Sequence, residues 1–262
     1  MQGEATQGRV VWTVTGADAL TFLQGMVSND LLPLAKAPGI VWAALLTPQG
    51  KYLADFFVVK LPDGPLLIDI AEPLAPATLR RLTMYRLRAD VQIAPSPLHV
   101  QRGLGDTPAN ALPDPRHPAL GWRAYTATAG SAPAIDWAAI RVAHAIPESG
   151  IELIPDDSYL LEHGFERLHG VDFRKGCYVG QEVTARMKHK TELKKGLVRV
   201  RVEGEATSPE ITTAEGKPAG TLFTRSGDRA IAYLRLDRAD GPLAAGAARV
   251  TLDPDQPQAP PS

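Results

Sequence analysis

One short stretch gathers most of the residue types that could do chemistry. It runs from Phe173 to His189 and reads FRKGCYVGQEVTARMKH. It holds the only cysteine of the 262-residue chain, Cys177, with Gly176 and Gly180 on either side and Lys175 two residues before it. Glycine lets another group approach the backbone closely, and nearby cations stabilise a thiolate. Cys177 is therefore a candidate nucleophile, redox group or soft metal ligand, although a lone cysteine can also be a small buried hydrophobe.

The charge around this stretch is unevenly distributed. Between Glu166 and Arg199 there are nine Lys and Arg against four Asp and Glu, whereas the whole chain has a net charge of −1. Two interpretations are open: a basic face over residues 174–199 that attracts a polyanion, or a solvated helix face of mixed charge. Glu182 and Arg186 are four residues apart, a spacing that allows an ion pair on one helix face.

Two further acids lie in settings where a carboxylate could bind or react. Asp55 stands between Ala54 and Phe56 in a strand-like run, so it either faces solvent or is buried with a partner. Glu148 lies in the loop IPESG, where it could accept two N–H donors from a flat heterocycle or be a plain turn residue. Arg141 could orient Glu148 or merely cover the helix surface.

Several function classes are disfavoured. The six histidines show no HExxH or HxH spacing, and no Walker, dinucleotide or GxSxG motif is present. No metal site is predicted, and any cluster bound at Cys177 would need ligands from elsewhere, because a cluster takes several cysteines. No apolar run approaches the roughly 20 residues that span a bilayer. The absence of a signal-like start and the single cysteine predict a cytoplasmic protein without a membrane segment.

Hydrophobic periodicity predicts a mixture of strands and helices that do not alternate at crossover spacing. The fold class is therefore expected to be α+β with antiparallel sheets, followed by a small β-barrel. The expected organisation is a body over 1–192, a barrel over 193–253 and a disordered tail over 254–262. Strands are expected over 9–14, 40–46, 52–60, 66–70, 91–94, 98–101, 196–202, 220–224, 230–236 and 248–252; helices over 17–29, 73–86, 135–145, 159–168 and 179–189; and a loop over 103–118.

The string KGCYVGQE, followed by AR, resembles the signature of the YgfZ-type folate-binding proteins, which are relatives of the glycine-cleavage T-protein. Three more segments are similar to that superfamily: Val14 to Leu31, Leu46 to Val59, and Ile146 to Gly150. The resemblance implies lobes around a central channel that binds tetrahydrofolate or a one-carbon derivative. It also implies a role in assembly or repair of iron–sulfur clusters in client proteins, including tRNA-modifying enzymes.

The same resemblance implies roles for individual residues. Glu148 matches the glutamate that recognises the pterin, Asp55 matches an acid at the reactive end of folate, and Arg141 matches a family arginine. T-proteins usually have two successive acids where this chain has Ala54-Asp55, and they resemble KGDFIGxE where this chain has KGCYVGQE. Architectural roles are expected for Tyr178, Gly180 and Glu182, and distinguishing roles for Cys177, Lys175, Gln181 and Arg186.

Two other functions stay open at this point. Retained Asp55 is compatible with a tetrahydrofolate-dependent aminomethyltransferase of the glycine-cleavage class, although the missing first acid and Cys177 argue against it. A non-catalytic binding module that acts only through its basic face is the third possibility. Whether the protein is an enzyme is therefore undecided from the sequence.

Overall fold

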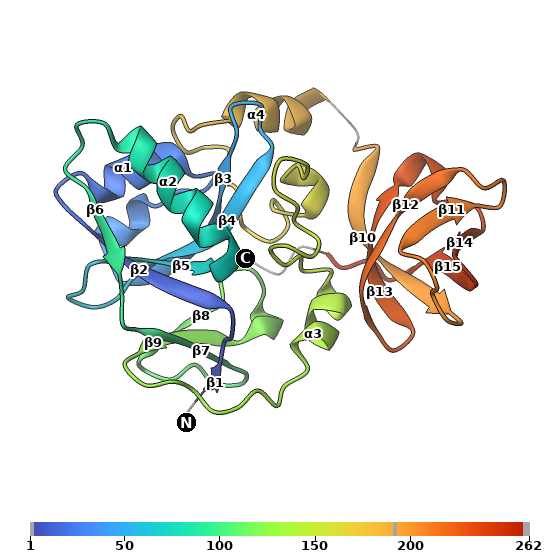
Figure 1. The fold of residues 1–262 in the computed structure, drawn as a ribbon, viewed down its shortest axis with the longest axis horizontal. Coiled ribbons are helices and arrows are strands. Elements are labelled where there is room, and N and C mark those ends of the chain that lie inside the picture. The colour runs from blue at the N-terminus through green and yellow to red at the C-terminus, as the bar shows by residue number, and fades with distance from the viewer. Residues whose placement is uncertain (1–2, 191–192, 259–262) are drawn as a thin grey trace. The chain divides into compact units, whose positions relative to one another are not determined.

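The computed structural model describes residues 3–190 and 193–258 (Figure 1). The chain separates into two compact units. The first unit runs to Ile135 and adds Pro155–Asp157 and Leu168–Val183; the second comprises Asp136–Ile154, Ser158–Arg167 and the chain from Thr184 onward.

The first unit contains two sheets whose adjacent strands all pair antiparallel. One sheet has the strand order β3-β4-β5-β2-β6 and the other β1-β7-β9-β8. The expected α+β class with antiparallel sheets is therefore confirmed. The strands are β1 (Glu4–Ala5), β2 (Arg9–Thr15), β3 (Gly39–Leu46), β4 (Tyr52–Lys60), β5 (Leu66–Ala71), β6 (Gln92–Pro95), β7 (His99–Gly103), β8 (Ala111–Pro113) and β9 (Trp122–Thr126).

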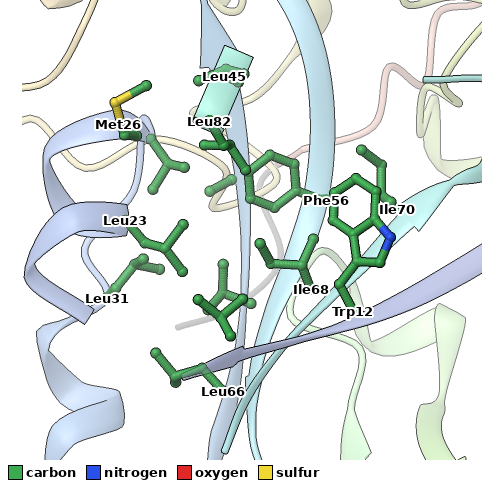
Figure 2. Close-up of a cluster of buried hydrophobic side chains, with 14 of the residues drawn as sticks. Trp12, Leu23, Met26, Leu31, Leu45, Phe56, Leu66, Ile68, Ile70 and Leu82 are labelled. Atoms are coloured by element: carbon green, nitrogen blue, oxygen red, sulfur yellow. The ribbon is translucent and has the colours of Figure 1, made fainter. Parts of the chain in front are cut away.

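Two helices cover one face of the five-stranded sheet. They are α1 (Ala19–Met26) and α2 (Ala75–Arg86), and 3-10 turns occupy Leu32–Ala35, Glu72–Leu74 and Pro118–Leu120. Leu23 of α1 and Leu82 of α2 pack with Phe56 and Ile68 of the sheet in one buried cluster (Figure 2). Removal of these apolar surfaces from water is the main force that fixes the helices on the sheet.

The side chains of β4 alternate between the two faces of this sheet. Phe56 belongs to the cluster beneath the helices, whereas Phe57 lies under the guanidinium of Arg123, which belongs to β9 of the other sheet. Both faces of β4 are therefore covered within the first unit. This explains why Asp55, which shares the face of Phe57, is only 4% exposed.

The second unit is built around a closed six-stranded barrel with the order β10-β13-β12-β11-β14-β15. The expected C-terminal β-barrel is confirmed. The helix α3 (Trp137–His144) packs against β12 and β13, and the 3-10 turn Leu161–His163 packs against β10, so both group with the barrel and not with the expected 1–192 body. The barrel strands are β10 (Lys195–Glu203), β11 (Glu210–Thr213), β12 (Pro218–Ser226), β13 (Arg229–Arg235), β14 (Leu243–Ala245) and β15 (Ala248–Leu252).

Three local expectations need correction. The helix expected over 159–168 is reduced to the turn Leu161–His163, because Gly164 takes a left-handed conformation with φ +75° and ends it. The loop expected over 103–118 contains the short strand β8, which pairs with β9. The strands β1, β9, β11 and β14 and the turn Leu236–Arg238 were not expected.

The expected disordered tail is wrong for residues 254–258. Gln256 accepts a hydrogen bond from the Arg199 amide at 3.0 Å and donates to the Arg199 carbonyl at 2.7 Å. Asp253, which is fully buried, accepts from the Arg199 side chain at 2.9 Å. Polar contacts with β10 thus hold a segment that has little apolar surface to bury, and residues 259–262 lie outside the described residues.

Candidate functional site

Lys175 fastens the cysteine-bearing segment to the end of α1. Its ammonium donates to the carbonyls of Gln24, at 2.7 Å, and Val27. The last carbonyls of a helix lack partners within the helix, and the negative end of the helix dipole favours a cation there. The ammonium also lies 4.9 Å from the centre of the Tyr178 ring. Lys175 is therefore an anchor of this segment.

Burial changes the acid–base behaviour of this lysine. Desolvation lowers the pKa of Lys175 from 10.5 to about 8, although Asp30 and Asp172 oppose the shift. The charged form is thus held with only a small margin at neutral pH.

The turn after α1 binds the same segment through two more side chains. The Ser28 hydroxyl donates to the Gly170 carbonyl at 2.7 Å, and the Asn29 amide donates to the His169 carbonyl at 2.7 Å. The end of the Val14 to Leu31 segment therefore holds the chain just before KGCYVGQE.

A close glycine-to-glycine contact fixes the other end of the segment. Gly180 has φ +84°, and a Cβ there would lie 2.5 Å from the Thr47 carbonyl oxygen. Gly50, in the turn between β3 and β4, has φ +77°, and a Cβ there would lie 2.7 Å from Cβ of Val183. Only glycine fits both positions without a shift of the backbone. The β3–β4 turn and the start of α4 (Gln181–Lys190) thus interlock.

Cys177 lies between these two anchors and is exposed. Gly176 is also exposed, has no positive φ, and would place a Cβ in open space. Beyond them, the Gln181 side chain accepts from the Tyr178 amide at 3.2 Å, and Glu182 lies in the first turn of α4, where a negative charge is favoured. The interpretation of Cys177 as a buried hydrophobe is therefore wrong.

Arg186 also lies on α4, and its side chain is exposed. The motif residues thus divide into two groups. One group contacts the rest of the chain, as described above for Lys175, Gly180 and Gln181. The other is defined by exposure alone and includes Gly176, Cys177 and Arg186.

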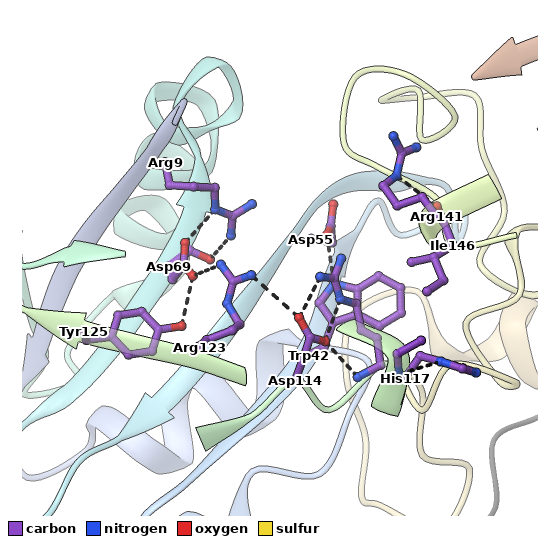
Figure 3. Close-up of polar contacts among 12 residues, drawn as sticks. Arg9, Trp42, Asp55, Asp69, Asp114, His117, Arg123, Tyr125, Arg141 and Ile146 are labelled. Atoms are coloured by element: carbon purple, nitrogen blue, oxygen red, sulfur yellow. Dashed lines mark hydrogen bonds and ion pairs between the residues drawn. The ribbon is translucent and has the colours of Figure 1, made fainter. Parts of the chain in front are cut away.

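Two aromatic side chains hold Asp55. The Trp42 indole N–H donates to Oδ2 at 2.8 Å, and the Tyr52 hydroxyl donates to Oδ1 at 2.6 Å. Of the two interpretations of Asp55, the buried one with partners is correct. Its carboxylate is fixed in orientation within the first unit (Figure 3).

A second buried aspartate, Asp69, was missed by the sequence analysis. It accepts from Arg9 Nε at 2.6 Å, from Arg123 Nη2 at 2.6 Å and from the Tyr125 hydroxyl at 2.9 Å (Figure 3). Burial alone would raise the pKa of Asp69, but Arg9 and Arg123 outweigh it and hold the pKa below its ordinary value. An acid inside the apolar strand LLIDIA was the available signal, the same one that singled out Asp55.

A further arginine, Arg116, contacts Trp42, the tryptophan that donates to Asp55. The Arg116 guanidinium binds Asp114 through two hydrogen bonds of 2.9 and 2.8 Å. It also lies 4.9 Å from the centre of the Phe57 ring and 5.8 Å from that of Trp42. The indole that donates to Asp55 therefore lies within cation–π distance of a guanidinium that Asp114 holds in place.

Arg141 of α3 joins two glutamates in the second unit. Its Nη1 lies 2.7 Å from Glu148 Oε2, its Nη2 contacts Glu152, and its Nε donates to the Ile146 carbonyl at 3.1 Å. Arg141 is buried, so it orients Glu148 and does not merely cover the helix surface. The Glu148 side chain is 52% exposed.

Glu152 is the buried member of this group and was also missed. It accepts from the Glu148 amide at 2.9 Å and from the Thr224 hydroxyl at 2.5 Å. Two glutamates four residues apart in one loop were the signal that could have found it. Asp55 belongs to the first unit, whereas Arg141, Glu148 and Glu152 belong to the second.

The local excess of positive charge overstates the exposed basic surface. Lys175 is engaged at α1, Arg199 is buried against Asp253, and Lys188 pairs with Glu166. The face expected over 174–199 is therefore smaller than the sequence suggested.

Two cavities of the described structure lie away from the predicted residues. A cavity of about 390 Å³ is lined by residues between Val14 and Leu66, and one of about 330 Å³ by residues between Thr213 and Pro242. Neither lining includes Asp55, Glu148 or Cys177. Within residues 3–190 and 193–258, no three His, Cys, Asp or Glu side chains group as metal ligands. The described helices are all too short or too polar to cross a membrane.

Comparison with known proteins decides the family. The iron–sulfur cluster assembly factor IBA57 of Mus musculus is 31% identical over 282 residues, which cover 90% of this chain and 78% of that protein. The Homo sapiens IBA57 is 30% identical with the same two coverages. This chain belongs to the IBA57 family. The IBA57 homolog of Mycosarcoma maydis is 31% identical over 80% of this chain, but the chain spans only 60% of that relative.

The two parts of the fold find separate matches. The family described as CAF17, C-terminal beta-barrel domain, matches residues 194–259. The crystal structure of the glycine cleavage system aminomethyltransferase T from Bartonella henselae superposes with a TM-score of 0.70, covering 94% of this chain and 82% of that one. Its sequence identity is 11%, so it confirms the T-protein-like fold alone.

Membership of the IBA57 family corrects one expectation. The relatives of Mycosarcoma maydis, mouse and human are all mitochondrial proteins, which contradicts the cytoplasmic location predicted from the sequence. The single cysteine could not separate the two locations, because a reducing cytosol and the mitochondrial interior place similar demands on a protein with one cysteine.

Proposed function

We propose that this IBA57-family protein assists the assembly or repair of iron–sulfur clusters in partner proteins and that Cys177 is the residue that acts. One observation carries the proposal: Cys177 is exposed on a segment whose two ends are fixed, at Lys175 and at Gly180. A fixed segment presents a thiol in one orientation at little entropic cost. One thiolate is a soft ligand for iron, but a cluster needs more, so the other ligands come from the client or assembly protein.

A rescue experiment tests the role of the thiol. In cells that lack the protein, Cys177→Ala should abolish recovery of iron–sulfur enzyme activity, including that of tRNA-modifying enzymes with clusters. The exposed Lys36→Ala is the matched control and should rescue fully. Full rescue by Cys177→Ala would remove the thiol from the function, and failure of the unmodified chain to rescue would refute the proposed function itself.

We further propose that the protein binds tetrahydrofolate or a one-carbon derivative, with Glu148 at the pterin. The half-exposed carboxylate of Glu148, oriented by Arg141, suits the paired N–H donors of a flat heterocycle. Asp55 is the candidate for the reactive end of folate, where a fixed carboxylate steers protons. When bound, folate would supply one-carbon chemistry; this chain supplies an oriented acceptor and an oriented buried acid.

Calorimetric titration with tetrahydrofolate tests this part separately. Glu148→Ala should weaken binding by about 1.5–3 kcal/mol, the worth of hydrogen bonds to a charged group. Glu166→Ala, which removes a surface partner of Lys188, should bind like the unmodified protein. Equal affinities for all three proteins would remove Glu148 from the site, and no binding by any of them would refute folate as the ligand.

The alternative function is aminomethyl transfer of the glycine-cleavage class, and the fixed carboxylate of Asp55 is the feature that favours it. An assay of aminomethyl transfer to or from a lipoyl carrier separates the two functions. Turnover that Asp55→Asn abolishes, with Cys177→Ala fully active, would replace the first proposal by this one.

A further inference from the structure

The C-terminal end of α2 carries an exposed leucine in a conformation that disfavours leucine. Leu87 is 88% exposed and has φ 46° and ψ −108°. The Ala89 amide donates to the Arg86 carbonyl at 2.8 Å, so Leu87 is the first central residue of a tight turn. These angles are close to those of a type II′ turn, where glycine dominates because other residues are strained at positive φ.

The fold gains nothing visible from this leucine. Its side chain is not among the residues that pack against the core beneath α2, where Leu79, Leu82 and Tyr85 lie. A glycine would relieve the strain and remove an apolar side chain from water. Strained residues of this kind gather at binding and switch sites, where the strained geometry serves recognition.

The surroundings of Leu87 are apolar and basic. Met84, one turn earlier on α2, is 62% exposed, and Arg80 and Arg88 are exposed as well. Because Ala75, Thr78 and Leu82 are the buried residues of α2, Arg80 and Met84 lie on its outer side, and Leu87 follows at its C-terminal end.

This basic patch is not neutralised locally. Residues 73–89 contain four arginines and no acid. Among the described residues, Arg80, Arg81 and Arg88 form no ion pair. With a net charge of −1 for the whole chain, the patch is a local feature and not part of a general basic character.

We propose that the patch formed by Arg80, Met84, Leu87 and Arg88 is a docking surface for a folded protein partner that offers a small apolar pocket ringed by Asp and Glu. The exposed arginines favour a partner with acidic residues around the contact, and the exposed Leu87 and Met84 favour an apolar pocket at its centre. Apolar side chains at the centre with charged side chains around them match the apolar core and polar rim of a protein interface.

An anionic membrane surface would also attract arginines beside apolar residues. Fluid lipid, however, accepts a leucine in any backbone conformation, so it gives no reason for the strained turn. Two apolar side chains also make a small area compared with the whole apolar face that an interfacial helix inserts. The geometry favours the protein partner, and the membrane becomes an outcome of the test.

Site-specific photo-crosslinking from position 87 in living cells identifies the partner, with a cross-linker at the exposed Leu104 as the matched control. The expected product is one protein, cross-linked at an acidic surface and absent from the Leu104 control. In binding measurements with that purified protein, Leu87→Gly should lower the affinity about tenfold or more while its thermal midpoint stays equal or rises.

Charge reversal completes the test. Arg80→Glu with Arg88→Glu should abolish the cross-link, and exchange of the mapped acids of the partner for lysine should restore it. The proposal is overturned by cross-links to lipid with co-sedimentation on phosphatidylserine vesicles, by products equal to those of the Leu104 control, or by binding insensitive to both Leu87→Gly and charge reversal.

Discussion

The same substitution by alanine should have different effects at the two glycines around Cys177. At Gly180 an alanine would be strained at φ +84°, and its Cβ would lie 2.5 Å from the Thr47 carbonyl oxygen and 2.9 Å from Leu46 Cβ. The backbone conformation costs about 1–2 kcal/mol, and the overlap with backbone that must shift adds about 1–3 kcal/mol. Gly180→Ala should therefore destabilise the first unit by about 2–5 kcal/mol, or about 5–15 °C in its midpoint of thermal unfolding.

Gly176→Ala is the matched control within the same motif. Its Cβ would enter open space and its φ is not positive, so its midpoint should change by less than about 2 °C. Differential scanning calorimetry of the three proteins measures both effects. Equal midpoints for the two variants would refute the reasoning that the β3–β4 turn fixes the start of α4. Loss of cellular rescue by Gly176→Ala, with stability unchanged, would show that a partner approaches the backbone beside Cys177.

Three further predictions concern buried charges. Asp69→Asn should lower the free energy of unfolding in urea by about 3–5 kcal/mol, because it leaves Arg9 and Arg123 without their charged partner. The pKa of Asp69 is lowered from 3.8, so the stability that it contributes is present above that pH and is lost as the pH falls below it. The pKa of Lys175 is lowered from 10.5 to about 8, so between pH 8 and 10.5 the unfolded chain binds more protons at this residue than the folded one. The free energy of unfolding in urea should therefore gain a contribution that rises with pH across this range, and Lys175→Met should remove that contribution. Glu152→Gln should destabilise the second unit several times more than Glu148→Gln does, because Glu152 is fully buried and Glu148 is half-exposed; equal urea midpoints would contradict this.

Local sequence patterns predicted the elements whose formation depends on local contacts. The hairpin of β3 and β4 was expected within one residue of its bounds, because two apolar runs flank the turn residues Pro48-Gln49-Gly50. The helix expected over 73–86 contains α2. The short strand β8 was missed because its three residues lie in a Gly- and Pro-rich stretch typical of a loop, and its partner β9 was missed with it.

The candidate residues were harder to interpret because burial depends on what covers each face. Alternation along β4 predicted that Asp55 could face solvent, but the second sheet covers that face, so Asp55 is buried with Trp42 and Tyr52. Asp69 and Glu152 were missed for the same reason. Their arginine partners come from other segments, such as Arg123 of β9 and Arg141 of α3, and pairs of that kind are not visible in one sequence without an alignment.

The division of the KGCYVGQE motif explains how one fold can accept different chemistry at one position. The contacts that hold the segment are made by the Lys175 ammonium, by the backbone at Gly180 and by the turn at Gly50. Because Cys177 itself is exposed, a change of its side chain should leave these contacts in place. The T-protein pattern KGDFIGxE, which this motif resembles, has an acid at that place. An exchange between acid and thiol there alters the group that the segment presents to a partner, while the anchors of the segment stay the same. We therefore assign the distinguishing chemistry to Cys177 and not to its anchors.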